Sequence, residues 1–242
     1  MIRGTAVRLD KILSNLGIAS RSESKNLLKA GRVKVNGAVA KSGAENVAGD
    51  AEITLDGKKL DTRLTRHLLL HKPAGILTAN EDGRQKTVMD LLPDAYRAMG
   101  CMPVGRLDKD TTGILLLTTD GDLAHRLISP NRHVDKVYEA QVDGMLDEED
   151  IRIFAEGIPL KDFTALPASL EIISPSLGRL TVQEGKYHQV KRMFGARGKP
   201  VTRLHRLSFG PIPLDEALAP GEYRELTDEE AAALYEAAGI QK

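Results

Sequence analysis

The chain has 242 residues, of which 41% are hydrophobic and 28% charged, a composition ordinary for a globular protein with one large or two smaller domains. The single cysteine, Cys101, excludes an internal disulfide and a cysteine-cluster zinc site, and no apolar run is long enough to cross a membrane. The net charge is zero, but residues 1–66 hold thirteen Lys and Arg against seven Asp and Glu, and residues 179–206 hold eight against Glu184. Two such basic segments fit selective contact with a polyanion, although a run of charges is more often simply a solvated face.

Neither a targeting signal nor a metal-binding pattern is visible. The first residues, Met1–Thr5, lack the apolar core of a signal peptide, so we expect the protein to stay in the cytoplasm. Histidines such as His125, His133 and His205 are scattered without ligand spacing, so we expect no bound metal.

The first part of the chain, residues 1–61, is predicted to form a compact module of two helices and a small sheet. Apolar residues recur at helical spacing in Val7–Leu16. Ser20 followed by Glu23 is a capping box that begins a second helix, and Gly31 ends it. An alternating pattern around Asn36-Gly37 then predicts a hairpin.

The second predicted helix carries a row of cations. Arg21, Lys25 and Lys29 follow each other at steps of four and share one face, and Arg32 and Lys34 come directly after the helix. Such a face suits a phosphate backbone, although a surface helix that only faces solvent would show the same pattern. The polar stretch that follows predicts a linker at residues 62–66 and a second domain over residues 67–242.

The second domain opens with short elements. His67–His71 is predicted to be a strand, Lys72-Pro73-Ala74-Gly75 a turn, and Ile76–Thr78 another strand. A charged loop follows, and Thr87–Leu92 is predicted to be helical.

The stretch from Gly105 to Gly121 joins a polar loop to a buried strand. The apolar run Ile114–Leu117 lies between turn residues, a pattern typical of a strand that is covered on both faces. Asp108 and its charged neighbours cannot be buried unpaired. We therefore expect the loop to lie at the rim of the core, facing a cleft or solvent.

Two other chemistries fit this loop poorly. The spacing of its aspartates matches the start of a calcium-binding EF-hand loop, but the required glutamate at the twelfth position is Thr119. A phosphatase-like D-x-D-x-T loop would follow a hydrophobic strand, whereas Val104–Leu107 is broken and polar. Taken by itself, Asp108 could simply support a turn or cap a helix.

The rest of the chain alternates helices and strands. The residues after Asp120 predict an amphipathic helix, and Lys136–Val142 alternates as a strand on which Tyr138 would commonly be half-buried packing. A helix at Ile151–Phe154 and strands at Leu166–Ile173 and Arg179–Val182 follow. The predicted class is α+β with a mostly antiparallel sheet.

A second informative segment is Gln183–Phe194, predicted as a helix that starts near Gly185. Its apolar side chains lie on one side, and the basic pair Lys191-Arg192 lies beside them. This segment lies in the second basic part of the chain.

Several of these segments resemble motifs of the Rsu/Rlu family of ribosomal RNA pseudouridine synthases. The catalytic motif is matched by G-R-L-D-K-D-T-T-G-I-L-L-L-T-T-D-G, and K-P-A-G, K-V-Y and E-G-K-Y-H-Q-V-K-R-M-F resemble further motifs. The first sixty residues, with R-L-D-K-I-L, G-I-A-S-R and G-R-V-K-V-N-G, resemble an RNA-binding domain shared by a small-subunit ribosomal protein and tyrosyl-tRNA synthetases. The resemblance implies the pseudouridine synthase fold: a small RNA-binding α/β module joined to a larger catalytic domain, whose mostly antiparallel mixed sheet is flanked by helices.

The resemblance also implies roles for individual residues. Asp108 takes the place of the catalytic residue, and Tyr138 that of the tyrosine that contacts the target base. Alignment on the His-Gln step gives Lys191 the ion pair with Asp108 and leaves Arg192 for RNA or packing. Adjacent helix positions point about 100° apart, so the reverse assignment of the two stays open.

Further residues are implied to contact RNA. Arg106 matches an arginine that fills the gap left by a flipped uridine, and an ion pair with Asp110 or a phosphate contact is the alternative. His188 and Gln189 complete the set near the proposed centre, and the cations of the first module track the RNA backbone.

The end of the chain indicates which RNA is modified. The segment Leu218–Thr227 resembles the ending of the branch that acts on small-subunit RNA. This implies a monomeric enzyme without cofactor that converts uridine 516 of 16S ribosomal RNA in an assembling small subunit. The alternatives are a 23S ribosomal RNA synthase and a catalytically idle factor that binds ribosomal RNA. The combination of Asp108, Tyr138 and Lys191 favours an enzyme, because a carboxylate would hinder pure binding of a phosphate-rich ligand.

Overall fold

The computed structural model describes residues 6–48 and 51–241. Contacts divide the chain into two compact units, residues 1–66 with 92–101 and residues 67–91 with 102–242. The start of the chain at Met1–Thr5 lies outside the described residues, so the absence of a signal peptide stays a prediction.

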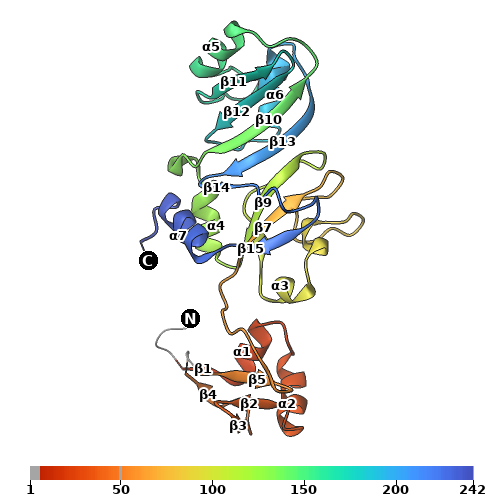
Figure 1. Ribbon diagram of the computed structural model, residues 1–242, viewed down its shortest axis with the longest axis vertical. Coiled ribbons are helices and arrows are strands. Elements are labelled where there is room, and N and C mark those ends of the chain that lie inside the picture. Colours follow the sequence, from red (N-terminus) through yellow and green to blue (C-terminus); the bar gives the residue numbers. More distant parts are fainter. Residues whose placement is uncertain (1–5, 49–50, 242) are drawn as a thin grey trace. The chain divides into compact units, whose positions relative to one another are not determined.

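The first unit combines two helices from its first segment with two small antiparallel sheets, one of two and one of four strands (Figure 1). The capping box predicted at Ser20 is confirmed, because the side chains of Ser20 and Glu23 each accept a hydrogen bond from the other's backbone. The predicted hairpin turn is confirmed as well, with Asn36 and Gly37 both at positive φ. The elements are β1 (Val7–Arg8), α1 (Leu9–Asn15), α2 (Arg21–Lys29), β2 (Val33–Val35), β3 (Ala38–Val39), β4 (Asn46–Val47), β5 (Ile53–Leu55), β6 (Lys58–Lys59) and, from the second segment, α3 (Asp94–Ala98).

The core of this unit is built from the apolar positions that the periodicity predicted. Leu9 and Leu13 of α1 and Val33 of β2 are fully buried, and Leu28 of α2 is nearly so. Met99, from the segment after α3, packs against the same cluster.

The second unit contains a mixed sheet in the order β11-β12-β10-β13-β9-β7-β15, with β14 paired to β13 and β8 to β9. Among these pairs only β9 with β13 is parallel, which agrees with the predicted mostly antiparallel sheet. The strands are β7 (His67–Lys72), β8 (Met102–Pro103), β9 (Thr112–Thr118), β10 (Lys136–Val142), β11 (Ser169–Ser174), β12 (Leu177–Val182), β13 (Val201–Phe209), β14 (Ile212–Pro213) and β15 (Tyr223–Glu225).

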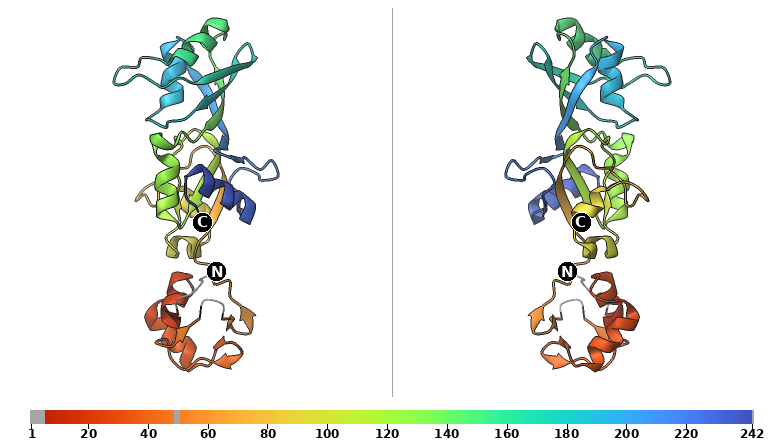
Figure 2. Two further views of the ribbon diagram at one scale, coloured as in Figure 1. Left: turned by 90° about the vertical axis from the view of Figure 1, so that its left-hand side faces the viewer. Right: turned by 90° about the vertical axis from the view of Figure 1, so that its right-hand side faces the viewer.

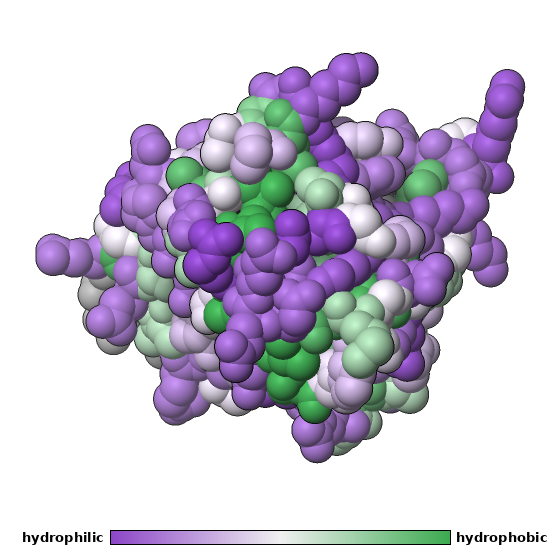
Figure 3. Space-filling model, turned by 90° about the horizontal axis from the view of Figure 1, so that it is seen from above, coloured by the Kyte–Doolittle hydropathy of each residue, from purple (hydrophilic) through white to green (hydrophobic). Residues whose placement is uncertain are grey.

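Helices cover the two ends of this sheet. The helices α4 (Gly121–Ile128) and α7 (Asp228–Ala237) lie side by side and bury a shared core against β7 and β9 (Figures 1 and 2). The helices α5 (Glu148–Glu156) and α6 (Gln189–Ala196) cover the other end, where Phe154 and Phe194 pack with ring centroids 4.8 Å apart. Viewed from above, that end carries mainly hydrophilic side chains around a central group of hydrophobic ones (Figure 3).

Three sequence predictions need correction. The first helix begins at Leu9, because Val7 and Arg8 pair with β4. Ile76–Thr78 is not a strand, because only Leu77 makes an isolated bridge, to Thr87. The next segment, predicted as helical over Thr87–Leu92, is helical only as a 3₁₀ turn at Val88–Leu91.

The third correction concerns the segment Gln183–Phe194. Its helix does not start near Gly185 but at Gln189, because His188 has a left-handed backbone conformation with φ of 51° that cannot continue a helix. Residues 183–188 therefore form a loop, and the C-terminal half of the segment forms α6.

Candidate active site

Hydrogen bonds from the protein interior hold the backbone of the loop that carries Asp108. The ammonium of Lys72, at the end of β7, is fully buried and donates to the carbonyl groups of Asp108, Lys109 and Thr111 at 2.9 to 3.3 Å. The backbone N–H of Gly75 donates to the Lys109 carbonyl at 2.7 Å. With its backbone fixed in this way, the loop turns its charged side chains outward.

A hydroxyl group fixes the start of the same loop. The Thr78 side chain donates to the Leu107 carbonyl at 2.8 Å and accepts from the Leu107 N–H at 3.2 Å. Burial lowers the pKa of Lys72 to about 8, while the nearby carboxylates of Asp110 and Asp108 act in the opposite direction. The lysine is therefore still protonated at neutral pH.

Lys191, on α6, forms the ion pair with Asp108. Its Nζ lies 2.9 Å from Asp108 Oδ2 and 2.6 Å from Asp110 Oδ1. Burial acts to lower the pKa of Lys191, but its bonds to Asp110 and Asp108 outweigh this and raise it. The hydrogen bond from Lys191 in turn lowers the pKa of Asp110. Lys191 is thus a permanent cation between two carboxylates at neutral pH.

Arg192 points away from this ion pair. Its guanidinium binds Asp162 and lies over the Phe163 ring, 5.0 Å from the ring centroid. The sequence assigned the ion pair with Asp108 to Lys191 and kept Arg192 as the runner-up, and in the structure Lys191 makes that contact.

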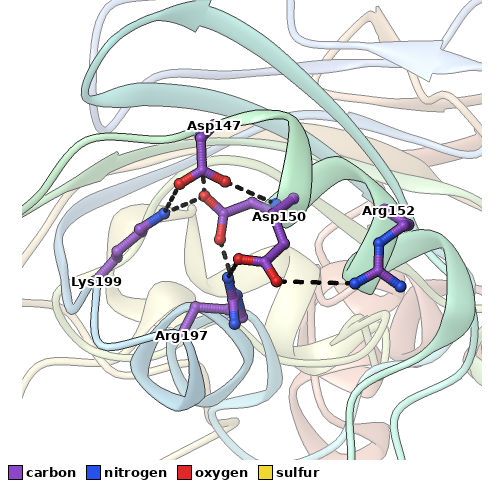
Figure 4. A network of polar contacts seen from close by, with 6 residues as sticks. Asp147, Asp150, Arg152, Arg197 and Lys199 are labelled. Carbon is purple, nitrogen blue, oxygen red and sulfur yellow. Dashed lines mark hydrogen bonds and ion pairs between the residues drawn. The ribbon is translucent and has the colours of Figure 1, made fainter.

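A cluster of ion pairs around one buried carboxylate fixes the far end of α6 (Figure 4). The fully buried carboxylate of Asp150, in the first turn of α5, binds Arg197 Nε at 2.9 Å and also binds Lys199 Nζ. Lys199 makes a second ion pair, with Asp147 at 3.0 Å. Because Arg197 and Lys199 follow α6 directly, the cluster locks this helix to α5 and so restricts where Lys191 can lie.

Tyr138, on β10, lies in the wall of the same cleft. It is 8% exposed and lines a hollow of about 60 Å³ together with Asp108, Arg106 and Leu204. A wider groove of about 630 Å³ shares Asp108 and Arg106 and extends along Lys191. The structure therefore brings Asp108, Tyr138 and Lys191 to one cleft from three segments far apart in the sequence.

Arg206, on β13, is a buried cation behind this cleft that sequence reasoning missed. It is 2% exposed, and it donates from Nε to the Ile114 carbonyl at 2.8 Å and from Nη1 to the Tyr138 hydroxyl at 3.4 Å. Its Nη2 has no hydrogen-bond partner in the described part of the chain. The strand alternates, and Arg206 follows Leu204 by two residues, so both side chains point inward. A cation at such an inward position was the signal that sequence reasoning missed.

A glycine allows the strand of Arg206 to approach the strand after the loop. Gly113 has φ of 107°, and a Cβ at this position would lie 2.2 Å from the Arg206 carbonyl oxygen. Only glycine permits the parallel contact between β9 and β13 at this point. Lys136, two residues before Tyr138, is buried in the same region, and its burial, followed by the repulsion of Arg206, lowers its pKa to about 8.

The remaining predicted residues near the cleft are divided between its rim and its interior. Arg106 is exposed at the rim, and among the described residues it makes no ion pair, whereas Asp110 is bound by Lys191. His188 Nε2 lies 3.4 Å from Asp108 Oδ1. Gln189 is 4% exposed, and its amide binds Glu184 and the Lys186 N–H, so an RNA contact through this amide would have to break internal bonds.

In the first unit, three of the predicted cations share one hollow of about 340 Å³. Arg21, Lys25 and Lys29 line it together with Lys41, which the sequence pattern did not indicate. The other two lie apart from it: Arg32 forms a two-point ion pair with Asp56, and Lys34 is exposed on β2.

Neither a metal cluster nor a membrane-spanning helix is found among residues 6–48 and 51–241. No group of three or more His, Cys, Asp or Glu side chains in these ranges is placed to hold a metal ion. The helices in the same ranges lack the length and apolar character that crossing a bilayer requires.

Comparison with known proteins identifies two families that match parts of the chain. The RNA pseudouridylate synthase family matches residues 66–196, and the S4 domain matches residues 7–53. The chain is 48% identical to an uncharacterized RNA pseudouridine synthase, YtzG, of Bacillus subtilis (strain 168), over 95% of this chain and 99% of that protein. It is 42% identical to ribosomal small subunit pseudouridine synthase A of Vibrio cholerae, over 95% of this chain and 100% of that protein.

A solved structure extends the likeness to the fold. The crystal structure of a pseudouridylate synthase, 38% identical in sequence, superposes with a TM-score of 0.67 and covers 95% of this chain and 100% of that one. A family match over more than half of the chain, together with relatives aligned along nearly its whole length, shows that this chain belongs to the RNA pseudouridylate synthase family.

Proposed function

We propose that this enzyme converts a uridine of ribosomal RNA to pseudouridine, and that its target is uridine 516 of 16S ribosomal RNA in an assembling small subunit. The observation that carries the proposal is the cleft in which Asp108 is paired with Lys191 and shares a hollow with Tyr138. The choice of the small subunit is supported by relatives named ribosomal small subunit pseudouridine synthase A, which align along nearly their full length.

The reaction needs few groups. It breaks the bond between the ribose and a ring nitrogen of uracil, turns the base and rejoins it through a ring carbon, with no net change of redox state. No external reactant enters, so side chains of the enzyme suffice. One chain supplies all three groups of the proposed centre, and we therefore take the enzyme to act as a monomer.

Asp108 is the proposed reactive group. Its carboxylate acts at the ribose, either as a nucleophile on the sugar or as a base that assists its deprotonation. Lys191 orients the Asp108 carboxylate through its ion pair, and its hydrogen bond to Asp110 lowers the pKa of that neighbouring carboxyl. Tyr138 stacks on the detached base or takes part in proton transfer, and Arg206 holds its hydroxyl in place.

The RNA must present an unpaired base, because a stacked and paired uridine hides its glycosidic bond. Arg106, exposed and without an ion pair among the described residues, is the proposed occupant of the gap that the flipped uridine leaves. His188 and Gln189 line the cleft, and Arg192 follows Lys191 on α6. All three are proposed to bind or support the RNA near the target. Arg21, Lys25, Lys29, Arg32 and Lys34 of the first unit are proposed to track the backbone of the RNA.

Mapping of pseudouridine in ribosomal RNA tests the proposed target. Cells that lack this protein should lose the modification at uridine 516, and re-expression of the wild-type chain but not of Asp108→Asn should restore it. Loss of a 23S site with an intact 16S site would instead identify a large-subunit enzyme. Unchanged modification at all sites would indicate an idle factor that only binds RNA. Since ribosomes are assembled in the cytoplasm, that is the compartment in which we expect the activity.

A further inference from the structure

Tyr187, in the loop before α6, exposes its aromatic ring at the mouth of the cleft. The residue is 76% exposed, the highest value among the exposed large hydrophobic side chains of the described residues. It lines the same groove as Asp108 and Lys191. An exposed aromatic ring beside the proposed reacting groups offers a flat apolar face to a ligand that enters the groove.

The ring of Tyr187 packs against the ring of its neighbour, His188. The rings of Tyr187 and His188 are stacked, with centroids 3.8 Å apart and planes 17° apart. Adjacent residues point in different directions in a strand or a helix, so a stack between them requires an unusual turn of the chain. The left-handed backbone of His188, with φ of 51°, supplies this turn at a cost in strain.

The second ring of the stack contacts the reacting carboxylate. His188 Nε2 lies 3.4 Å from Asp108 Oδ1, so a single side chain separates the Tyr187 ring from the Asp108 carboxylate. Cations flank the loop: Lys186 Nζ lies 3.9 Å from the centroid of the Phe163 ring, and Arg192 binds the Tyr187 carbonyl at 3.4 Å. The Tyr187 ring is thus largely exposed, and the two neighbouring cations are held by Glu184 and Asp162 beside the loop.

We propose that Tyr187 and His188 form a stacking platform for the base of a nucleotide next to the target uridine in the substrate RNA. A nucleotide adjacent to one whose ribose lies at Asp108 is within reach of a ring one side chain away, and its phosphate would lie near Lys186. Every base has a π face that an aromatic ring can accept. The platform would hold the strand in its opened form while the uridine occupies the hollow beside Tyr138.

The platform rests on Asp108 as the site of reaction, and it adds a contact that neither the sequence motifs nor the comparisons assign. Its expected strength follows from base stacking on aromatic side chains. Tyr187→Ala should weaken binding of the RNA by about 5- to 150-fold. Tyr187→Phe keeps the ring and should bind like the wild type, whereas Tyr187→Leu keeps apolar bulk without a π face and should behave like Tyr187→Ala.

The test is a double-mutant cycle in which substitutions in the protein are combined with changes in the RNA. Fluorescence anisotropy would measure the affinity of each variant for a fragment of 16S ribosomal RNA around uridine 516, and for two copies with an abasic site on either side of the target. If Tyr187 stacks on one of these bases, the abasic site at that position should weaken the wild type, and Tyr187→Ala should add no further loss. A ring that only supports His188 would instead give additive losses at both positions.

Two further measurements keep the interpretation clear. Met145→Ala removes a side chain that is 71% exposed but lies outside the groove, and it should leave the affinity unchanged. Turnover of the intact fragment by the wild type is recorded in parallel, so that a wrong RNA target shows as missing product rather than as a change in the cycle. Equal affinity of Tyr187→Ala and wild type, or additive losses at both flanking positions, would overturn the platform.

Discussion

Removal of the buried ammonium of Lys72 tests how the loop that carries Asp108 is held. Lys72→Met keeps the length of the side chain but removes its donors, so the carbonyl groups of Asp108, Lys109 and Thr111 lose a partner at 2.9 to 3.3 Å. A buried carbonyl without a partner costs about 1 to 3 kcal/mol. The loop reaches the surface at Lys109, where water can replace part of the lost bonds. We therefore expect the free energy of unfolding to fall by about 2 to 4 kcal/mol.

The same substitution should slow the reaction. Because one of the freed carbonyl groups belongs to Asp108 itself, its carboxylate should lose its fixed position, and the single-turnover rate should fall about 10- to 100-fold. Urea unfolding measures the loss of stability, provided that the free energy of both proteins depends equally steeply on urea concentration. Pseudouridine formation in a pre-bound RNA measures the rate.

Lys109→Met is the matched control for this experiment. Its ammonium is exposed and binds the side chain of Gln85, so its loss should change the stability by no more than about 0.5 kcal/mol. If Lys72→Met unfolds at the same urea concentration as the wild type and reacts at the same rate, Lys72 does not hold the loop.

Three further predictions concern neighbouring cations. Burial lowers the pKa of Lys72 from 10.5 to about 8, so between these pH values the unfolded chain holds more protons than the folded one. The stability of the wild type relative to Lys72→Met should therefore rise with pH across this range. Urea midpoints of the two proteins that shift in parallel with pH would contradict this. Arg206 has no ion pair among the described residues, so Arg206→Met should leave the free energy of unfolding unchanged or raise it by about 1 kcal/mol. The reaction rate should fall, because the Tyr138 hydroxyl loses its donor. Thermal unfolding and single-turnover assays would separate the two effects. Arg106→Lys should be nearly as slow as Arg106→Ala on structured RNA but much less impaired on a strand whose uridine is already unstacked, and near-wild-type rates on both would show that only the charge matters.

Local patterns predicted the regular elements well. The alternation of Lys136–Val142 and the capping box at Ser20 each depend on neighbours in sequence, and the structure confirms both. The loop before α6 was mistaken for helix, because its form depends on Gln189 and Glu184 binding each other inside the protein and on the left-handed backbone of His188. Such bonds leave no periodic signal.

The sequence named the residues of the proposed site and one contact between them, the ion pair of Lys191 with Asp108, but not the contacts that hold them in place. The motif resemblance indicated Asp108, Tyr138 and Lys191. The choice between Lys191 and Arg192 depends on the rotation of α6, which the charges around Asp150 fix at its far end. The buried cations Lys72 and Arg206 lie at inward positions of strands, where residue type alone suggests exposure. Their roles follow from the carbonyl groups and the hydroxyl that surround them, and these become neighbours only in the fold.

The most direct test of the proposed centre is single-turnover formation of pseudouridine by Asp108→Asn. The substitution keeps the shape of the side chain and removes its charge, so the variant should bind a 16S ribosomal RNA fragment nearly as tightly as the wild type. It should form no detectable pseudouridine when enzyme is in excess over RNA, whereas Asp110→Asn should retain measurable activity. Substantial product from Asp108→Asn under these conditions would contradict the assignment of Asp108 as the reactive group.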